Sequence, residues 1–202
     1  GDGLTGENAD SGFPTARGAS TVEEFIKQQA KIVSAISRID ADIVGLMEIE
    51  NDGYGEQSAI ASLVAALNAH MGEGTYAFVS PGRELLGDDD IAVGLLYKPA
   101  RVSLSGPAIV LDEANSPLDD SGMVLFDTTK NRPVLTQQFG VLPDEGSLVV
   151  AVNHFKSKGS DCEALNDPDL GDGQGNCNLT RTRAAKALGE WLNNTYGEEQ
   201  GS

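Results

Sequence analysis

The sequence is poor in basic residues, in aromatic residues and in histidine. It has 14 Lys and Arg against 31 Asp and Glu, which gives a formal net charge of −17. Such a field repels polyanions unless cations intervene, so the composition argues against a basic groove for nucleic acid. It does not exclude an enzyme that reaches phosphate through a divalent metal, because a bound cation is often the largest local charge in its site. The alternative is that the acidic surface only keeps the protein soluble.

The sequence also lacks any long apolar segment. No stretch approaches the roughly 20 apolar residues of a transmembrane helix, so no membrane span is predicted. The chain begins Gly1-Asp2-Gly3, without the basic and apolar regions of an export signal, and we expect any such signal to lie upstream. A chain of 202 residues is long enough for one substantial core, and one domain is expected.

Cysteine is scarce, and the two cysteines, Cys162 and Cys177, lie in one polar, glycine-rich loop. We predict a disulfide between them, and two reduced cysteines are the alternative. The disulfide would close a loop of about 15 residues, contribute about 3 kcal/mol in the chain-entropy model, and indicate an oxidising compartment.

Helical periodicity predicts three helices, from about Ser20 to Arg38, Ser58 to His70 and Thr180 to Asn194. The first would begin at a capping box in which Ser20 accepts from the N–H of Glu23. The residues expected to face the core are Phe25, Ile32, Ile36 and Ile39 in the first helix, Ile60, Leu63, Val64 and Leu67 in the second, and Ala184, Ala185, Leu188, Trp191 and Leu192 in the third.

The segment from Asp42 to Glu48 is almost continuously apolar, which is typical of a strand covered on both faces, with Glu48 at its C-terminal end. Several further strands, some pairing antiparallel, are predicted at Tyr76 to Val79, Ile91 to Tyr97, Val102 to Leu104, Ala108 to Leu111, Met123 to Phe126, Val134 to Val141 and Leu148 to Asn153. Early helices followed by hairpin strands predict sheets packed face to face with helices outside.

Two strand ends carry candidate functional side chains. Burying an unpaired carboxylate is costly, so Glu48 should bind a metal, meet an arginine or face a cleft; its position alone leaves a metal ligand and a structural salt bridge open. His154 follows the strand that ends at Asn153, and Lys156 and Lys158 come directly after it. A histidine there can protonate a leaving oxygen and the lysines can neutralise a phosphate, or these groups are only hydrogen-bonded and solvated.

Weaker signals come from Arg132 and Asp90. The Arg132 guanidinium opens a long strand and suits a bidentate grip on phosphate. Asp90 ends an acidic run before a strand, where it could orient a histidine or belong to a polar turn. The second histidine, His70, is interpreted as a surface residue.

These motifs together resemble one family. The sequences Glu23-Phe-Ile-Lys-Gln28, Gly45-Leu-Met-Glu-Ile-Glu-Asn51, Ala92-Val-Gly-Leu-Leu-Tyr97, Asn131-Arg-Pro133 and Asn153-His-Phe-Lys-Ser-Lys158 are similar to those of bacterial extracellular nucleases of the endonuclease/exonuclease/phosphatase superfamily. The likeness runs from about Arg17 to Trp191, in the family's order.

The resemblance implies an α/β (α+β) fold, a four-layer sandwich of two mostly antiparallel sheets flanked by helices, and hydrolysis of phosphodiesters by metal-activated water. It implies that Glu48 holds Mg²⁺ or Mn²⁺ and that His154 assists the leaving group. Asp90 would support His154 and Arg132 would contact the substrate phosphate. Asn153, Lys156 and Lys158 are candidate substrate-binding residues.

The family's first strand with a metal-site asparagine, its Asp-x-Asn pair and its closing Ser-Asp-His have no counterpart in the sequence. We therefore expect a single domain over residues 1–202 that is truncated at both ends, with weak or no activity of its own, and natural loss of these motifs is the alternative. The polar loop from Asn166 to Asn178 carries oxygen ligands that suit a structural Ca²⁺, or it is an ordinary polar loop.

The predicted function is that of a secreted, monomeric nuclease acting on DNA. One alternative is a sibling phosphodiesterase or phosphatase acting on phospholipid head groups or phosphorylated sugars. Another is a non-catalytic binding module that retains the scaffold.

Overall fold

The chain divides into two compact units, which are described one at a time. The computed structural model describes residues 19, 21–143 and 146–197. One unit comprises Gly1–Ile109 with Leu135–Val152, and the other comprises Val110–Val134 with Asn153–Ser202. The Arg17 end of the sequence resemblance lies outside the described residues. The single domain expected from the sequence stays a prediction.

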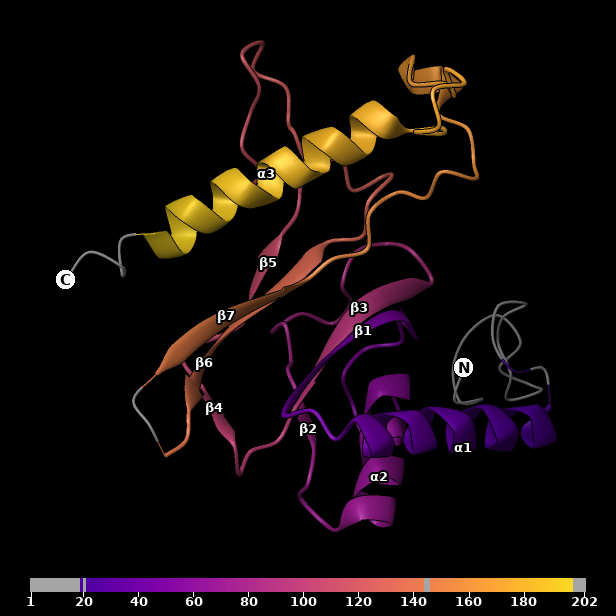
Figure 1. The fold of residues 1–202 in the computed structure, drawn as a ribbon, viewed down its shortest axis with the longest axis vertical. Helices are drawn as coiled ribbons and strands as arrows, with labels where there is room; N and C mark the ends of the chain where they lie inside the picture. The colour runs from indigo at the N-terminus through magenta and orange to yellow at the C-terminus, as the bar shows by residue number, and fades with distance from the viewer. Residues whose placement is uncertain (1–18, 20, 144–145, 198–202) are drawn as a thin grey trace. The chain divides into compact units, whose positions relative to one another are not determined.

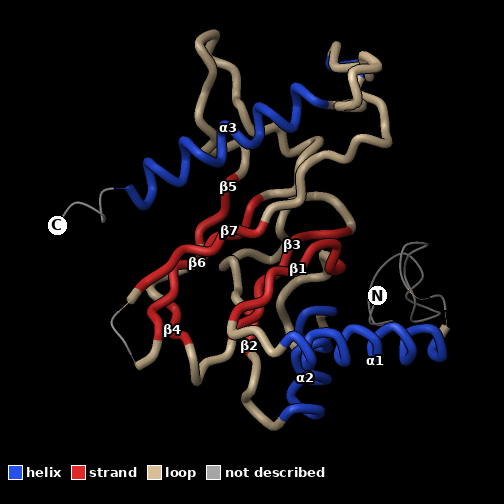
Figure 2. Tube along the Cα trace, in the orientation of Figure 1, coloured by secondary structure: helices blue, strands red, loops and turns tan. Residues whose placement is uncertain are grey.

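The first unit contains two helices and most of the strands (Figure 1; strands are red in Figure 2). In chain order its elements are α1 (Val22–Ile39), β1 (Ile43–Glu50), α2 (Ala59–Met71), β2 (Ala77–Phe78), β3 (Ile91–Tyr97), β4 (Val102–Leu104), β6 (Val134–Val141) and β7 (Ser147–Val152). The short strand β5 (Ile109–Leu111) begins in this unit, whereas the 3₁₀ helix η2 (Glu163–Leu165) and α3 (Asn178–Tyr196) belong to the second.

The strands of the described residues form two sheets. The first has the order β1-β3-β2, and the second has the order β4-β6-β5 with β7 also paired to β6. β1 pairs antiparallel with β3 from Ile43↔Tyr97 onward, and β6 pairs antiparallel with β7 from Leu135↔Val152 onward. The predicted antiparallel pairing is therefore confirmed.

Two glycines show how the layers of the first unit pack. A Cβ atom on Gly94 would lie 3.1 Å from Ile60 Cδ1, so this face of the β1-β3-β2 sheet meets α2. A Cβ atom on Gly45 would lie 3.3 Å from Val152 Cγ2, so the sheet also meets β7 of the second sheet. The ring contact between Tyr97 and Phe139, with centroids 5.8 Å apart, joins the same two sheets. The unit is thus layered as helix, sheet and sheet, which agrees with the predicted α+β sandwich class.

The second predicted helix is confirmed closely. Ser58 is the N-cap of α2 and its hydroxyl accepts from the N–H of Ala61 at 3.3 Å. The predicted inward residues are all buried: Ile60, Leu63, Val64 and Leu67. His70 is exposed, as expected.

The cap and the inward face of α1 were predicted wrongly. Thr21, not Ser20, is its N-cap and accepts from Glu24 N–H at 3.2 Å, and Ser20 lies outside the described residues. Ile36 is buried and Phe25 is half-buried, but Ile32 is 40% exposed and Ile39 is 69% exposed. Val33 is buried in their place, because α1 presents only a narrow stripe to the core cluster that it shares with α2.

Two further predictions need correction. In α3 Ala184 and Trp191 are buried and Leu188 and Leu192 are half-buried, but Ala185 is exposed and Ala187 takes its place in the core. The strand predicted from Met123 to Phe126 does not form: the described residues there make one isolated bridge, Leu118↔Val124.

The strand β1 also differs from its prediction. None of its residues is fully buried, because β1 is the edge strand of its sheet. It continues to Glu50, so Glu48 lies two residues before its end. No helix in the described part of the chain is long and apolar enough to cross a membrane.

Candidate functional site

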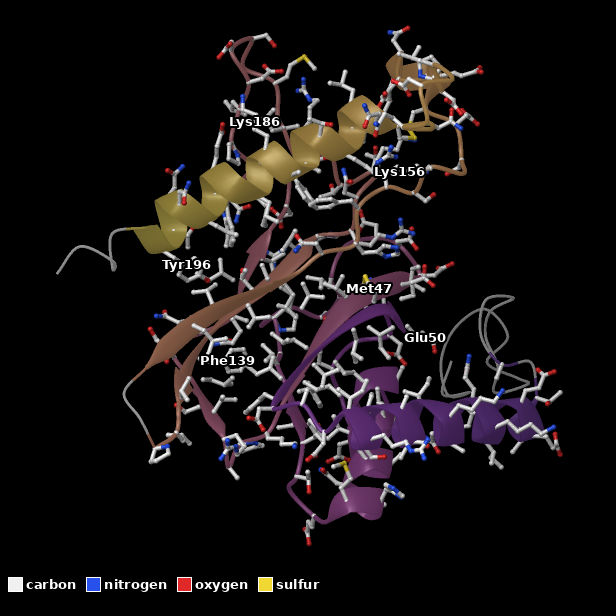
Figure 3. The ribbon with its side chains drawn as sticks, viewed as in Figure 1. Met47, Glu50, Phe139, Lys156, Lys186 and Tyr196 are labelled. Carbon is white, nitrogen blue, oxygen red and sulfur yellow. A yellow bond between two sulfur atoms is a disulfide. The ribbon has the colours of Figure 1, made fainter. Side chains whose placement is uncertain are left out.

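Glu48 lies in an irregularity of β1. Leu46 pairs with Gly94 and Ile49 pairs with Ala92, so Met47 and Glu48 both lie opposite Val93. This is a β-bulge, a feature that re-aims side chains and is common beside active sites. Glu48 has a φ of 60°, in the left-handed region, and its side chain is exposed. A residue with a side chain is held there at a cost of about 1–3 kcal/mol. Figure 3 labels Met47, one of the two bulge residues, and Glu50, the last residue of β1.

Asn51 fixes the loop that precedes β3. Its Nδ2 donates to the carbonyls of Gly87 and Asp89, both at 3.0 Å, and its Oδ1 accepts from Leu86 N–H at 3.0 Å. Its own N–H donates to the Asp90 carbonyl at 2.9 Å. Asp90 directly precedes β3, and β3 begins opposite Glu50. The first unit therefore brings Glu48 and Asp90 to the same end of one strand pair.

The fit of this end of the sheet to a metal rests on Glu48. Mg²⁺ is usually held by one or two carboxylates together with waters and substrate phosphates, so an exposed carboxylate at a bulge suits it. Among the described residues, no three His, Cys, Asp or Glu side chains gather into a group that could hold a metal. Glu48 thus provides hard oxygen ligands of the right kind for Mg²⁺ or Mn²⁺, without a closed cage.

The second unit brings the segment around Arg132 against the segment around His154. The N–H of Arg132 donates to the His154 carbonyl at 3.2 Å. The N–H of Lys156 donates to Asn131 Oδ1 at 3.0 Å, and Asn131 Nδ2 donates to the Asp127 carbonyl at 2.9 Å. Asn131 is only 1% exposed, so it is a buried amide that bridges two segments 25 residues apart.

The ammonium of Lys156 lies among other cations. Burial lowers the pKa of Lys156, and the charges of Lys130 and Arg132 lower it further, as does that of Arg181. Asp161 acts in the opposite direction. Like charges beside an ammonium disfavour its charged form, and perturbed pKa values are common at functional sites.

The remaining predicted residues flank this cluster. Asn153 and His154 are half-buried, with Asn153 Oδ1 and His154 Nδ1 among the buried atoms. Lys158 is exposed, and its stem packs on the chain at Gly175, where a Cβ atom would lie 3.0 Å from Lys158 Cβ. The second unit therefore brings together Arg132, His154 and Lys156, while Lys158 extends to solvent.

The two cysteines form the predicted disulfide. Cys162 and Cys177 are joined, with Cα atoms 5.3 Å apart, and both are buried. In the same loop Asp167 caps α3: its Oδ1 accepts from Leu179 N–H at 3.0 Å, and its Oδ2 accepts from Thr180 N–H at 2.8 Å. Burial raises the pKa of Asp167, but hydrogen bonds from Thr180 and Leu179 outweigh this and lower it below its usual range.

The loop from Asn166 to Asn178 is also where the sequence suggested a structural Ca²⁺. Asp169 Oδ1 and Asp172 Oδ1 each accept a backbone N–H two residues later, at 2.9 Å. These carboxylates therefore serve the loop's own turns, and a structural Ca²⁺ stays a prediction.

The sequence did not identify three residues that position the candidate site: Asn51, Asn131 and Arg181. The motifs contained Asn51 and Asn131, but only the fold shows that their amides join separate segments. For Arg181 the sequence offered one indication. It lies near the start of a predicted helix, where the macrodipole disfavours cations. The pairing of Asp90 with His154, which lie in different units, stays a prediction.

The comparisons with known proteins bear on the fold. No protein-family model matches the sequence, and no curated protein matches it. Among solved structures, the chain is similar to the crystal structure of an endonuclease/exonuclease/phosphatase family protein from Bacteroides thetaiotaomicron, with a TM-score of 0.52 and 12% sequence identity. The likeness covers 86% of this chain and 52% of that chain, so this chain spans about half the length of that structure. At this identity the likeness concerns the fold.

Proposed function

We propose that this chain carries the core of a metal-dependent phosphodiesterase, an extracellular nuclease that degrades DNA. The observation that carries the proposal is the exposed carboxylate of Glu48, held at a φ of 60° in a β-bulge. Such a conformation is unfavourable for glutamate, and it persists where the position of the side chain is useful. The fold similarity to an endonuclease/exonuclease/phosphatase family protein supports the same chemistry.

In this proposal Glu48 would hold Mg²⁺ or Mn²⁺ together with water. The metal, when bound, supplies charge stabilisation at the phosphoryl oxygens. Arg132 grips a phosphate oxygen, since its guanidinium matches that geometry. His154 assists departure of the leaving alkoxide as a general acid, and Asp90 holds His154 in the required orientation. Asn153, Lys156 and Lys158 bind the rest of the substrate.

The disulfide supports a secreted protein, because such bonds persist in oxidising compartments. We further propose that the protein is a monomer, which sedimentation would test.

A structural Ca²⁺ in the loop 166–178 is a secondary proposal. If the loop binds Ca²⁺, chelation with EGTA should lower the melting temperature of the protein.

Metal titration tests the first step of the mechanism. Mg²⁺ or Mn²⁺ should raise the stability of the chain by about 2.7 kcal/mol at a hundredfold excess over the dissociation constant. Glu48→Gln should remove most of this gain, and Glu56→Gln, on another exposed glutamate of the first unit, should keep it. A chain that neither gains stability from metal nor binds DNA would favour the non-catalytic binding module.

The net charge of −17 favours one other substrate class, because it opposes the approach of a polyanion. That second candidate is a phosphodiesterase or phosphatase acting on phospholipid head groups or phosphorylated sugars. Assays of plasmid DNA beside sphingomyelin, a sugar phosphate and a chromogenic phosphodiester separate the two. Turnover of the lipid or the sugar phosphate but not of DNA would replace the nuclease assignment.

A further inference from the structure

Four cationic side chains gather in the second unit of a chain whose net charge is −17: Lys130, Arg132, Lys156 and Arg181. The charges of the other three act on Lys156 and lower its pKa, and the charge of Asp161 acts on it in the opposite direction. Like charges repel, so such a group is unfavourable by itself. An anion bound among the four would reverse that balance.

The backbone and the side chains of the second unit hold this group together. Asn131 accepts from Lys156 N–H at 3.0 Å, which fixes the turn that carries Lys130 and Arg132 beside Lys156. Arg181 donates to the Asn176 carbonyl at 2.6 Å, to the Gln174 carbonyl at 2.8 Å and to the Lys156 carbonyl at 3.5 Å. Figure 3 labels Lys156 close to the N-terminal end of α3, the helix to which Arg181 belongs.

The start of α3 adds to the positive potential. Arg181 lies near the positive end of the helix macrodipole, where acidic side chains are the usual choice, and the first turn of α3 contains none. Asp167 offsets part of this charge as the cap.

The ammonium of Lys130 is available to a ligand. It makes no hydrogen bond or ion pair with any residue that the structure describes, and its side chain is half-buried. The Lys156 ammonium meets a neutral group, the hydroxyl of Ser160. In the part of the chain that the structure describes, no carboxylate forms an ion pair with either ammonium.

We propose that Lys130, Lys156 and Arg181 form a second phosphate site beside Arg132, which binds a non-scissile phosphate of a polymeric phosphodiester. This rests on the proposed phosphodiesterase function, in which Arg132 contacts the scissile phosphate. A substrate with neighbouring phosphates gains from this site, whereas a substrate with one phosphodiester does not. The site thus favours nucleic acid over lipid or sugar phosphates. It also provides a local positive charge that attracts phosphates, although the net charge of the chain repels them.

Binding without turnover tests the site. Fluorescence anisotropy of a labelled 12-nucleotide single strand, measured in EDTA over a range of salt concentrations, reports affinity and the number of phosphate contacts. Lys130→Gln and Lys156→Gln should each weaken binding about tenfold and reduce the salt slope by about 0.7. Lys186→Gln is the matched control, since Lys186 lies on the exposed side of α3 and pairs with Glu190 at 3.7 Å. The control should bind like the wild type.

Lys130→Gln keeps the test interpretable if Arg181 or Lys156 variants fold poorly, because the Lys130 ammonium makes no hydrogen bond or ion pair with the described residues. Unchanged affinity and slope in Lys130→Gln and Lys156→Gln would overturn the proposal, as would an equal loss in Lys186→Gln. Equal competition by polyglutamate and inorganic polyphosphate would overturn the assignment to phosphate. Because the assay needs no hydrolysis, binding of this kind by a chain that cleaves nothing would reject the proposed activity and keep the site.

Discussion

The side-chain carbonyl of Asn131 accepts a hydrogen bond from the backbone N–H of Lys156 at 3.0 Å, across 25 residues of sequence. The same amide donates to the Asp127 carbonyl at 2.9 Å, and its side chain is buried. One buried amide thereby places the turn before β6 against the segment that follows β7. Removing it would leave the Lys156 N–H without this acceptor, whereas the Asp127 carbonyl would keep the backbone N–H of Asn131 at 2.9 Å.

Asn131→Ala should therefore destabilise the chain by about 1–3 kcal/mol, the usual penalty for buried polar groups that lose their partner. It should also weaken the binding of a phosphate-rich ligand, because Arg132 and Lys156 lose their common support. Urea unfolding and anisotropy measure the two effects. Asn115→Ala is the control: its amide, on an exposed residue, also bonds the backbone, at 2.7 Å to the Val110 carbonyl, but does not join the two segments that carry the cations. A variant Asn131→Ala that binds like Asn115→Ala would contradict the positioning role.

Two variants of Glu48 separate the backbone strain at this position from its role in metal binding. Glycine adopts a φ of 60° without strain, so Glu48→Gly should be about 1 kcal/mol more stable than Glu48→Ala. Both variants should lose metal-dependent stabilisation equally, since both lack the carboxylate. Thermal unfolding with and without Mg²⁺ gives both quantities. Equal stability of the two variants would show that the bulge is relaxed with any side chain.

Asp167 should stabilise the start of α3 by about 1–2 kcal/mol, as a cap that satisfies the N–H groups of Leu179 and Thr180. Asp167→Ala should show this loss in urea unfolding at neutral pH. Asp172→Ala is the control, because exposed Asp172 accepts one backbone N–H within its own turn and should change stability by about 0.5 kcal/mol or less.

The effect of Asp167 should depend on pH in one direction. Its pKa is lowered in the folded chain, so protonation favours the unfolded chain. The contribution of Asp167 to the free energy of unfolding is complete above its pKa in the unfolded chain, about 3.9. It is lost as the pH falls through the lower pKa of the folded chain. The difference between wild type and Asp167→Ala should therefore shrink below about pH 4. A difference that is unchanged in acid would mean that the carboxylate charge does not matter.

The disulfide closes the loop that carries Asp167. Replacing both cysteines, Cys162→Ser with Cys177→Ser, should cost about 3 kcal/mol, since the cross-link restricts a 15-residue loop in the unfolded chain. Urea unfolding of the oxidised wild type beside the double variant measures this. Reduction of the wild type should give the same loss, and a much smaller loss would indicate that the loop is held by its other contacts.

The local elements were largely predictable because apolar runs and turn residues are local signals. The bounds of β3, β4 and β6 follow directly from such runs, and Ser58 marks the start of α2 as a cap. Tertiary exposure was less predictable: Ile32 and Ile39 have helical spacing, yet α1 packs through Val33 and Ile36. The segment from Met123 to Phe126 has strand composition but forms only a bridge.

The sequence predicted which residues belong to the candidate site, but it did not predict how they are arranged in space. The carboxylate of Glu48 was evident, but its bulge depends on the register with β3, which no single-strand pattern contains. The contacts of Asn131 and Arg181 with Lys156 join residues 25 positions apart in each case, and local periodicity carries no information on such pairs.

In the proposed function, Glu48 serves metal-dependent cleavage of phosphodiesters. The most direct test is nicking of supercoiled plasmid DNA by the longest form of the protein that its gene encodes, with Mg²⁺ and with EDTA. Cleavage should require the metal, and Glu48→Gln should lower the rate at least about a hundredfold, as expected for loss of a group that stabilises the transition state. Wild-type cleavage rates in a folded Glu48→Gln protein, or cleavage that continues in EDTA, would contradict the account.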